Sequence, residues 1–226
     1  MPLETTSSVL TTLLNIRHSC RAFRPDPVPR TVQEQLLQMA QRTASWCNSQ
    51  PWQVHITEGA ATERLRAALS TAAPSAAGSD FPWPREYRGV YQERRRECGF
   101  ALYDSVGIAR GDREASARQT QENFRLFGAP HVAIVTSDEA LGVYGAVDCG
   151  AYVANFLLAA ASLGVATIPQ AALASHSALL RRFFVLGDDR RVVCGISFGY
   201  ADADHPANKF RTTRADVGTA AAWMTK

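Results

Sequence analysis

The feature that most constrains this chain is a run without any formal charge, from Ala151 to Ile168. The run is long enough to span a bilayer. However, Asn155 and Ser162 interrupt it, and Ala dominates over Leu and Ile. Gly164 and Pro169 end it, and no Lys or Arg flanks either end closely. We therefore predict a core helix that is buried on nearly every side, and no membrane span.

The composition is that of an ordinary globular chain. Its 226 residues are enough for a sizeable core, and no linker or shift in composition divides them. Hydrophobic residues make up 46% of the chain and charged residues 20%, which is the balance of a folded protein. We predict one domain over 1–226. Within it, 199–226 is too poor in apolar residues to form its own core and is expected to be a C-terminal arm on a partner subunit or a mobile tail.

Charge and cysteine content narrow the partners and the compartment. The net charge of +3 tolerates an anionic ligand, but no basic stripe with interleaved aromatics predicts nucleic-acid binding. Residues 1–8 lack the basic leader and apolar core of a secretory signal. The cysteines lack the paired spacings of metal sites or disulfide frameworks, so we expect no metal and reduced thiols in the cytoplasm. They are Cys20, Cys47, Cys98, Cys149 and Cys194.

The first two helices are predicted from apolar spacing. Residues 9–16 repeat at helical intervals, and three prolines between 25 and 29 separate this helix from the next. Thr31 and Glu34 form a capping-box pattern at the start of the second helix. Its predicted buried face consists of Val32, Leu36, Leu37 and Ala40.

The rest of the chain predicts an α+β fold, in which a few strands are surrounded by many helices. We expect strands over 52–56, 132–135, 165–168 and 192–198, and helices over 61–72, 112–126, 144–163 and 177–184. An irregular piece over 74–84 leads into a charged helix with three consecutive arginines, 94–96. No Gly-x-Gly-x-x-Gly turn supports a dinucleotide-binding Rossmann site.

A dense basic segment follows the first helix, in the sequence Arg17-His18-Ser19-Cys20-Arg21-Ala22-Phe23. Arginine presents a fixed fork of donors that suits phosphate oxygens, and Ser19 adds a hydroxyl without bulk. The segment is therefore a candidate anion grip. On its own such a segment is more often a helix end whose basic side chains complement the C-terminal dipole.

Three separated segments together resemble one family, the FMN-dependent nitroreductases and their flavin-reductase relatives. Residues 17–23 are similar to the family's Arg-x-Ser-x-Arg/Lys-x-Phe signature, and Asn48-Ser49-Gln50-Pro51-Trp52 to its Asn-x-Gln-Pro-Trp motif. The stretch from Gly195 to Tyr200, followed by Asn208-Lys209-Phe210-Arg211, resembles the last strand and the basic motif after it. Taken singly, each segment is also explained as a turn, a core strand or solvated charge.

The resemblance implies a homodimer with FMN at its interface and a nitroreductase-like fold. The first segment and the basic pair after the last strand would hold the phosphate, with Arg21 the candidate near flavin N1, while the Asn48 loop reaches the partner's flavin. The backbone amides of Ala171 and Ala172 would face N5 and O4. The residues implied around FMN are Arg17, His18, Ser19, Arg21, Ser45, Trp46, Asn48, Gln50, Pro169, Gln170, Ala171, Ala172, Lys209 and Arg211.

Two departures from the family pattern concern the acceptor. Many relatives have Pro-Ser-Ser where this chain has Ala44-Ser45-Trp46, which places an indole near the flavin or the dimer seam. Some relatives have a carboxylate in the turn that Gln170 begins here, so only main-chain donors remain.

The implied activity is ping-pong transfer of electrons from NADH or NADPH, through flavin N5, to a nitroaromatic or other planar acceptor, with no catalytic side chain. A flavin or quinone reductase of the same fold, and an FMN storage or sensor module without turnover, remain alternatives. Aromatic and basic residues after the irregular piece are candidate contacts for a nitrobenzoate-like acceptor, although they are also typical of a solvated helix face. The candidate substrate contacts are Trp46, Trp83, Arg85, Tyr87 and Arg88.

Overall fold

An antiparallel sheet of four strands forms the centre of the computed structural model, which describes residues 3–72 and 78–225. The strands are β1 (Gln53–Thr57), β2 (His131–Asp138), β3 (Ala166–Gln170) and β4 (Arg190–Gly199). They lie in the order β1-β2-β4-β3, and each neighbouring pair is antiparallel. All four predicted strands are present. The α+β fold is confirmed.

The inner strands β2 and β4 are covered on both faces, as their continuous apolar sequences predict. Val132 and Val135 on β2, and Val192 and Ile196 on β4, have no exposed surface. The register between these two strands shifts between Val135 and Thr136. The centre of the sheet is therefore the most protected part of the molecule.

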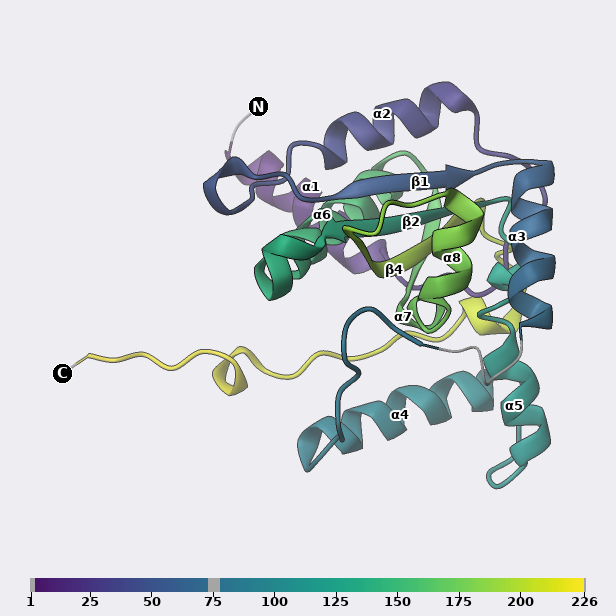
Figure 1. Cartoon of the computed structure of the whole chain (residues 1–226). Helices are drawn as coiled ribbons and strands as arrows, with labels where there is room; N and C mark the ends of the chain where they lie inside the picture. Colours follow the sequence, from purple (N-terminus) through teal and green to yellow (C-terminus); the bar gives the residue numbers. More distant parts are fainter. Residues whose placement is uncertain (1–2, 73–77, 226) are drawn as a thin grey trace.

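One face of the sheet is covered by α2 (Arg30–Ala40) and α6 (Gly142–Ser162), and α1 (Leu3–Ile16) packs against α6 (Figure 1). On α6, Phe156 has no exposed surface and packs edge-on against Phe198 of β4, with 5.8 Å between the ring centroids. Aromatic pairs of this geometry add to the free energy gained from burial. The predicted uncharged run therefore supplies the core of this layer.

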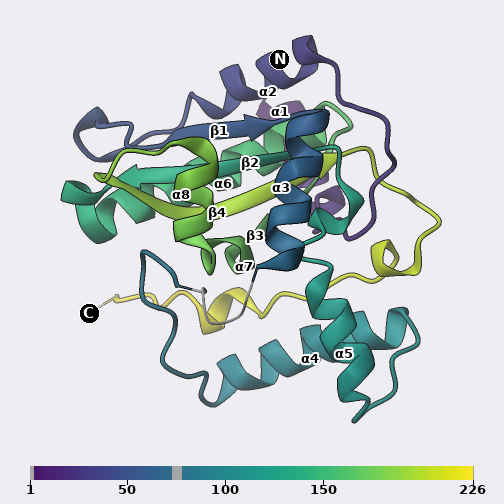
Figure 2. The same ribbon diagram turned by 45° about the vertical axis from the view of Figure 1, so that its right-hand side comes forward.

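The opposite face carries α3 (Ala60–Thr71), α7 (Ala171–Ala174) and α8 (Ser177–Phe184) (Figure 2). Leu173 of α7 and Leu180 of α8 are fully buried in a second apolar cluster with residues of α3 and of the inner strands. The two layers and the sheet between them are called the body below.

Two further helices leave the body: α4 (Val90–Ser105) and α5 (Arg113–Gln121). Figures 1 and 2 show both below the body, away from the sheet. Neither helix has a buried residue. We call residues 78–121 the excursion. Of the irregular piece predicted over 74–84, residues 74–77 lie outside the described residues.

The root of the excursion is fixed to the body by a largely buried ion pair. Both carboxylate oxygens of Asp80 lie 2.9 Å from the Arg181 guanidinium on α8. The same carboxylate accepts a hydrogen bond of 2.7 Å from the Val192 amide on β4. Asp80 thus fixes the start of the excursion to α8 and β4.

The C-terminal segment leaves the body after β4. It passes through a short 3₁₀ helix, η5 (Pro206–Asn208), and then extends alongside α4 and past it (Figures 1 and 2). Trp223 is 84% exposed. This exposure agrees with an arm that has no core of its own.

The helix predicted over 144–163, which includes the start of the uncharged run, is less buried than expected in the turns before that run. Val143, Tyr144 and Val147 of α6 are largely exposed, and Leu10 and Leu14 of α1 are about half exposed. Apolar periodicity identifies the hydrophobic face of a helix but does not show which surface, if any, covers that face. By length and composition the segment 139–162 passes the test for a membrane span, a test that core helices also pass.

The predicted capping box is wrong. The helix α2 begins at Arg30, directly after Pro29, and has no side-chain cap. Thr31 already lies inside the helix, and Glu34 accepts from Arg30 at 3.1 Å instead. The fixed φ of Pro29 sets the helix entry, and the buried Gln33 side chain donates to the Val28 carbonyl at 2.9 Å.

Candidate functional site

The basic segment after α1 is pinned to the sheet edge. Ser19 forms a parallel bridge with Thr167 of β3, and the Cys20 amide donates to the Thr167 carbonyl at 2.9 Å. Farther along, Phe23 bridges Ala201, which follows β4. The segment therefore extends along β3 beyond the end of α1, so its basic groups are held by the sheet and not by a helix terminus.

This placement brings four predicted residues around one cavity of about 310 Å³. They are Arg17, His18, Ser19 and Arg21. The opposite wall comes from the C-terminal segment, which contributes the predicted Arg211 together with Arg214. Five of the fourteen residues implied around FMN are thus gathered in one place from segments almost 200 positions apart.

Asn208 joins the two walls of the cavity. Its side-chain oxygen accepts from the Arg21 amide at 2.6 Å, and its Nδ2 donates to the Ala22 and Asp202 carbonyls at 2.9 and 2.8 Å. Its own carbonyl accepts from the Arg211 guanidinium at 2.8 Å. A single buried amide therefore fixes the C-terminal segment against the basic segment.

The cavity is strongly cationic. Burial lowers the pKa of His18, and the nearby Arg211, Arg17 and Arg21 lower it further, while a hydrogen bond with the Ile16 carbonyl opposes them. Burial, and then the charge of Arg214, lowers the pKa of Arg17. No carboxylate lines this cavity in the described part of the chain. Such unpaired cations favour an anion with more than one charge.

Arg21 connects this cavity to a second one. Its pKa is lowered chiefly by burial, and its guanidinium lies 5.2 Å from the centre of the Phe210 ring. The same side chain lines a cavity of about 220 Å³ at the end of β3. This second cavity is lined by Pro169, Gln170, Ala171 and Ala172, all of them predicted.

The turn expected from Gln170 onward is the end of β3 followed at once by α7. Because the first amides of a helix have no intrahelical acceptor, those of Ala171 and Ala172 remain available as donors. The buried side chain of Gln170 is engaged elsewhere: Nε2 donates to the Asn123 carbonyl at 2.9 Å, and Oε1 accepts from Ser197 Oγ at 2.5 Å. Gln170 thus anchors the junction.

Lys209 does not line either cavity in the described structure and is exposed. It follows η5 directly, where Asn208 turns inward and is buried. Side chains of consecutive residues in such a turn point in different directions. Lys209 therefore faces solvent although its neighbour Asn208 faces the interior.

The loop that precedes β1 contains four predicted residues, Ser45, Trp46, Asn48 and Gln50. This loop lines neither cavity. Ser45 Oγ accepts from the Gln50 amide at 2.9 Å, and the Trp46 amide donates to the Asp148 carboxylate at 3.2 and 3.3 Å. Asn48 and Gln50 have φ values of 54° and 47°. Positive φ at residues other than glycine stores strain, and such loops are common at functional sites.

Trp46 stands at the edge of a separate hollow of about 390 Å³. It is 62% exposed and meets Tyr144 edge-on, with 4.7 Å between the ring centroids. Tyr144 belongs to the exposed apolar part of α6. The loop and the exposed face of α6 therefore form one continuous surface.

The remaining candidate substrate contacts lie in the excursion, outside both cavities. Trp83 and Tyr87 are about half exposed. Arg85 and Arg88 both pair with Glu86 on the surface. Within one chain the structure does not bring these four residues to Arg21.

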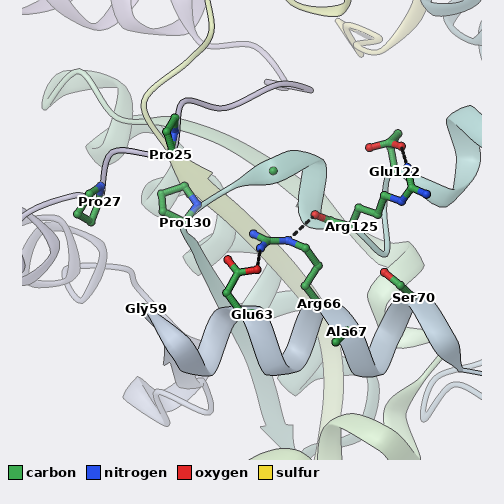
Figure 3. Close-up of a pocket in the computed structure, with 11 residues that line it drawn as sticks. Pro25, Pro27, Gly59, Glu63, Arg66, Ala67, Ser70, Glu122, Arg125 and Pro130 are labelled. Carbon is green, nitrogen blue, oxygen red and sulfur yellow. Dashed lines mark hydrogen bonds and ion pairs between the residues drawn. The ribbon is translucent and has the colours of Figure 1, made fainter.

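A hollow of about 800 Å³ is a different region (Figure 3). Its charges are satisfied internally. Arg66 pairs with Glu63 and donates to the Arg125 and Ala129 carbonyls at 3.0 and 2.6 Å. Arg125 in turn pairs with Glu122 at 3.0 Å. Because both of its arginines are paired with glutamates, this hollow is a poor site for a phosphate.

Sequence reasoning missed Arg214 and the role of Asn208. Arg214 had a weak signal, because it is the third basic residue in the short run that begins at Lys209. Asn208 belongs to the motif that the sequence indicated, but the sequence assigned no function to its side chain. The contribution of α4, whose Cys98 and Tyr103 line the two cavities, had no sequence signal.

The fold and the paired cavities define a class: an α+β protein with a cationic cavity between a basic segment and a returning C-terminal segment. Residues 14–200 match the model of the Nitroreductase family. The chain belongs to this family.

Relatives and solved structures agree. The chain is 38% identical over 208 residues to nitroreductase NfnB of Mycolicibacterium smegmatis, covering 91% of this chain and 88% of that protein. It is 33% identical over 199 residues to a 4-nitrobenzoate reductase of Pseudomonas putida, covering 88% of each. The crystal structure of the FMN-dependent nitroreductase NfnB from Mycobacterium smegmatis in complex with NADPH superposes with a TM-score of 0.92 at 35% identity, covering 97% of this chain and 99% of that one.

Proposed function

We propose that this chain is an FMN-dependent nitroreductase, which takes electrons from NADPH or NADH and delivers them to a nitroaromatic acceptor. The observation that carries the proposal is the cationic cavity around Arg17, joined through Arg21 to the cavity at the start of α7. The relatives named as nitroreductases and 4-nitrobenzoate reductases support the acceptor class.

The residues present fit FMN. One phosphate monoester matches a cavity with several cationic donors and no carboxylate, and charge-assisted bonds to it are strong. The second cavity offers the amides of Ala171 and Ala172 as main-chain donors for the ring. When bound, FMN supplies the two-electron chemistry that links a reduced nicotinamide to the acceptor.

The chain's own residues then have three tasks. Arg17, Ser19 and Arg211 hold the phosphate, and Asn208 keeps the two walls of the cavity together. Arg21, held by burial and by the Phe210 ring, places a positive charge where the two cavities meet and so favours an anionic ring. No side chain needs to act as an acid or base in this scheme.

We further propose a homodimer in which each loop 45–50 completes the partner's site. The loop is strained, exposed and remote from Arg21 within its own chain, which is the arrangement expected of a group that serves a second subunit. The exposed apolar residues of α1 and α6 would be covered by the same contact, and the arm 199–226 would lie on the partner. Lys209, exposed in a single chain, would then meet the phosphate only if the arm shifts on assembly.

The decisive experiment is cheap. The purified protein should be yellow, should release FMN on denaturation, and should scatter light as a dimer. It should oxidise NADPH or NADH and reduce 4-nitrobenzoate with ping-pong kinetics. A colourless protein that takes up no FMN would overturn the proposal. Tight FMN binding without nucleotide oxidation would identify a storage or sensor module, and reduction of flavins or quinones alone would identify a reductase of that type.

The compartment is a separate proposal. All five cysteines are free, and burial raises the pKa of the Cys20 and Cys149 thiols to about 11. Thiols of this kind are typical of the reducing cytoplasm, where we place the protein.

A further inference from the structure

An outer groove opens from the phosphate cavity. It has a volume of about 600 Å³ and lies between one face of α4 and the segment 211–215. Cys98, Arg211 and Arg214 line both the groove and the cavity, so the two form one continuous depression. The groove is of the size that holds a nucleotide.

Two arginines in the groove have no carboxylate partner in the described part of the chain. Arg214 donates only to the carbonyls of Thr212 and Thr213 and to the Thr212 hydroxyl. Arg94 has no ion pair or hydrogen bond there, although Glu93 and Glu97 line the same groove. Three arginines against two glutamates leave the groove positive overall.

Arg94 is in excess of what one phosphate requires, and Arg214 is shared between the groove and the inner cavity. Arg17, Ser19, Arg21 and Arg211 already surround the inner cavity. Arg94 lies outside it, on the far side of the groove. The geometry therefore provides a second anion site beside the first, and a molecule bound in the groove lies next to the phosphate cavity.

We propose that the outer groove binds the 2′-phosphorylated adenosine end of the electron donor, with Arg94 and Arg214 on the 2′-phosphate. NADPH carries this phosphate and NADH does not, so the chain should prefer NADPH. The aliphatic side chains of Val90 and Ala101 line the groove as well and give the adenine an apolar wall. This inference rests on the proposed function, whose donor it specifies.

The test measures donor preference in the FMN-loaded enzyme. The double variant Arg94→Gln with Arg214→Gln removes both charges and keeps much of the side-chain bulk. The ratio of kcat/KM for NADPH to that for NADH should fall by about tenfold or more, through a rise in the KM for NADPH, because strong charge-assisted bonds are lost. The matched control is Arg96→Gln, on the same helix but outside the groove, and it should leave the ratio unchanged.

Two glutamates in the groove, Glu93 and Glu97, allow the opposite change in charge to be tested. Glu93→Gln with Glu97→Gln removes the negative charges from the groove and should raise the same ratio, because a phosphate dianion is then repelled less. A merely structural role of α4 would lower the efficiency with both donors. A fall in the ratio in the double glutamate variant, or equal changes for NADPH and NADH in both double variants, would overturn the proposal.

A binding measurement separates this inference from the proposed function, because it needs neither FMN nor turnover. Titration calorimetry of the protein with 2′-AMP should show tighter binding than with 5′-AMP, and the double arginine variant should lose the difference. Equal binding of the two nucleotides in the native chain would refute the groove assignment alone. A protein without FMN would refute the proposed function, whatever the outcome with 2′-AMP.

Discussion

The body and the excursion of this chain are built on opposite principles. In the body, inner strands and α6 bury residues such as Ile196 and Phe156 completely. In the excursion, α4 and α5 have no buried residue, and their charges pair with each other or face solvent. The difference teaches that stability is concentrated in the body, while the excursion is free to present side chains to ligands. Four predictions test this division.

The largest effect is expected from the body. Phe156→Ala should lower the free energy of unfolding by about 3–5 kcal/mol, because it removes a fully buried ring and leaves a cavity. Tyr91→Ala in the excursion, where the side chain is 66% exposed, should change it by less than about 0.5 kcal/mol. Urea denaturation of both variants measures the contrast. Similar losses would mean that the excursion packs as tightly as the body.

The second prediction concerns the cationic cavity, which joins the two regions. Arg17→Ala and Arg211→Ala should each weaken FMN binding by about 1.5–3 kcal/mol, or roughly ten- to a hundredfold, through the loss of a charge-assisted bond. Arg94→Ala, in the outer groove, should leave FMN binding nearly unchanged. Fluorescence titration of the apoprotein provides the affinities. Equal losses in all three variants would place the phosphate elsewhere.

The third prediction concerns recognition by the excursion. If Arg85 and Arg88 meet the carboxylate of an acceptor, nitrobenzoates should be reduced with a higher kcat/KM than nitrobenzene. Both arginines are exposed and already pair with Glu86, so replacing both by Ala should erase only a preference of several-fold. FMN content serves as the control. A preference that survives would move acceptor recognition to the loop around Trp46.

The smallest effect is a pH dependence of FMN binding. Burial and neighbouring arginines lower the pKa of His18 in the free protein, and a bound phosphate dianion should raise it. Between these two values the complex holds a proton that the free protein lacks, so binding should tighten as the pH falls through that window. The phosphate itself takes up a proton near pH 6, which acts in the opposite direction. The difference between the wild type and His18→Gln, measured from pH 8 to pH 6, isolates the histidine, and identical curves would contradict the prediction.

Much of the fold could be predicted from sequence because apolar periodicity reflects local geometry. All four strands were located to within a few residues, and so was α6. The coverage of α6 could not be predicted, because Val147 has the same apolar character whether water or a second subunit faces it. The entry to α2 was wrong for a related reason: Thr31 and Glu34 have capping chemistry, but Pro29 already fixes the turn.

The candidate site was predictable in part. A motif resemblance indicated Arg17, Arg21 and Arg211, and the structure brings them to one cavity. Lys209 shares the motif but not the cavity. Arg214 and the contribution of α4 depend on how the C-terminal segment crosses the excursion, which no short-range pattern records.

The anchoring of the excursion has a consequence for engineering. At its root, Asp80 is held by Arg181 and by a β4 amide, and just beyond α5 the Asn123 carbonyl is held by Gln170. The chain between Asp80 and Asn123 therefore leaves and rejoins the body at two positions that are held by hydrogen bonds. The loop 81–89 lines neither of the two cavities nor the outer groove. It could therefore be replaced by segments of different sequence and length, which makes this scaffold a suitable starting point for libraries selected on new acceptors.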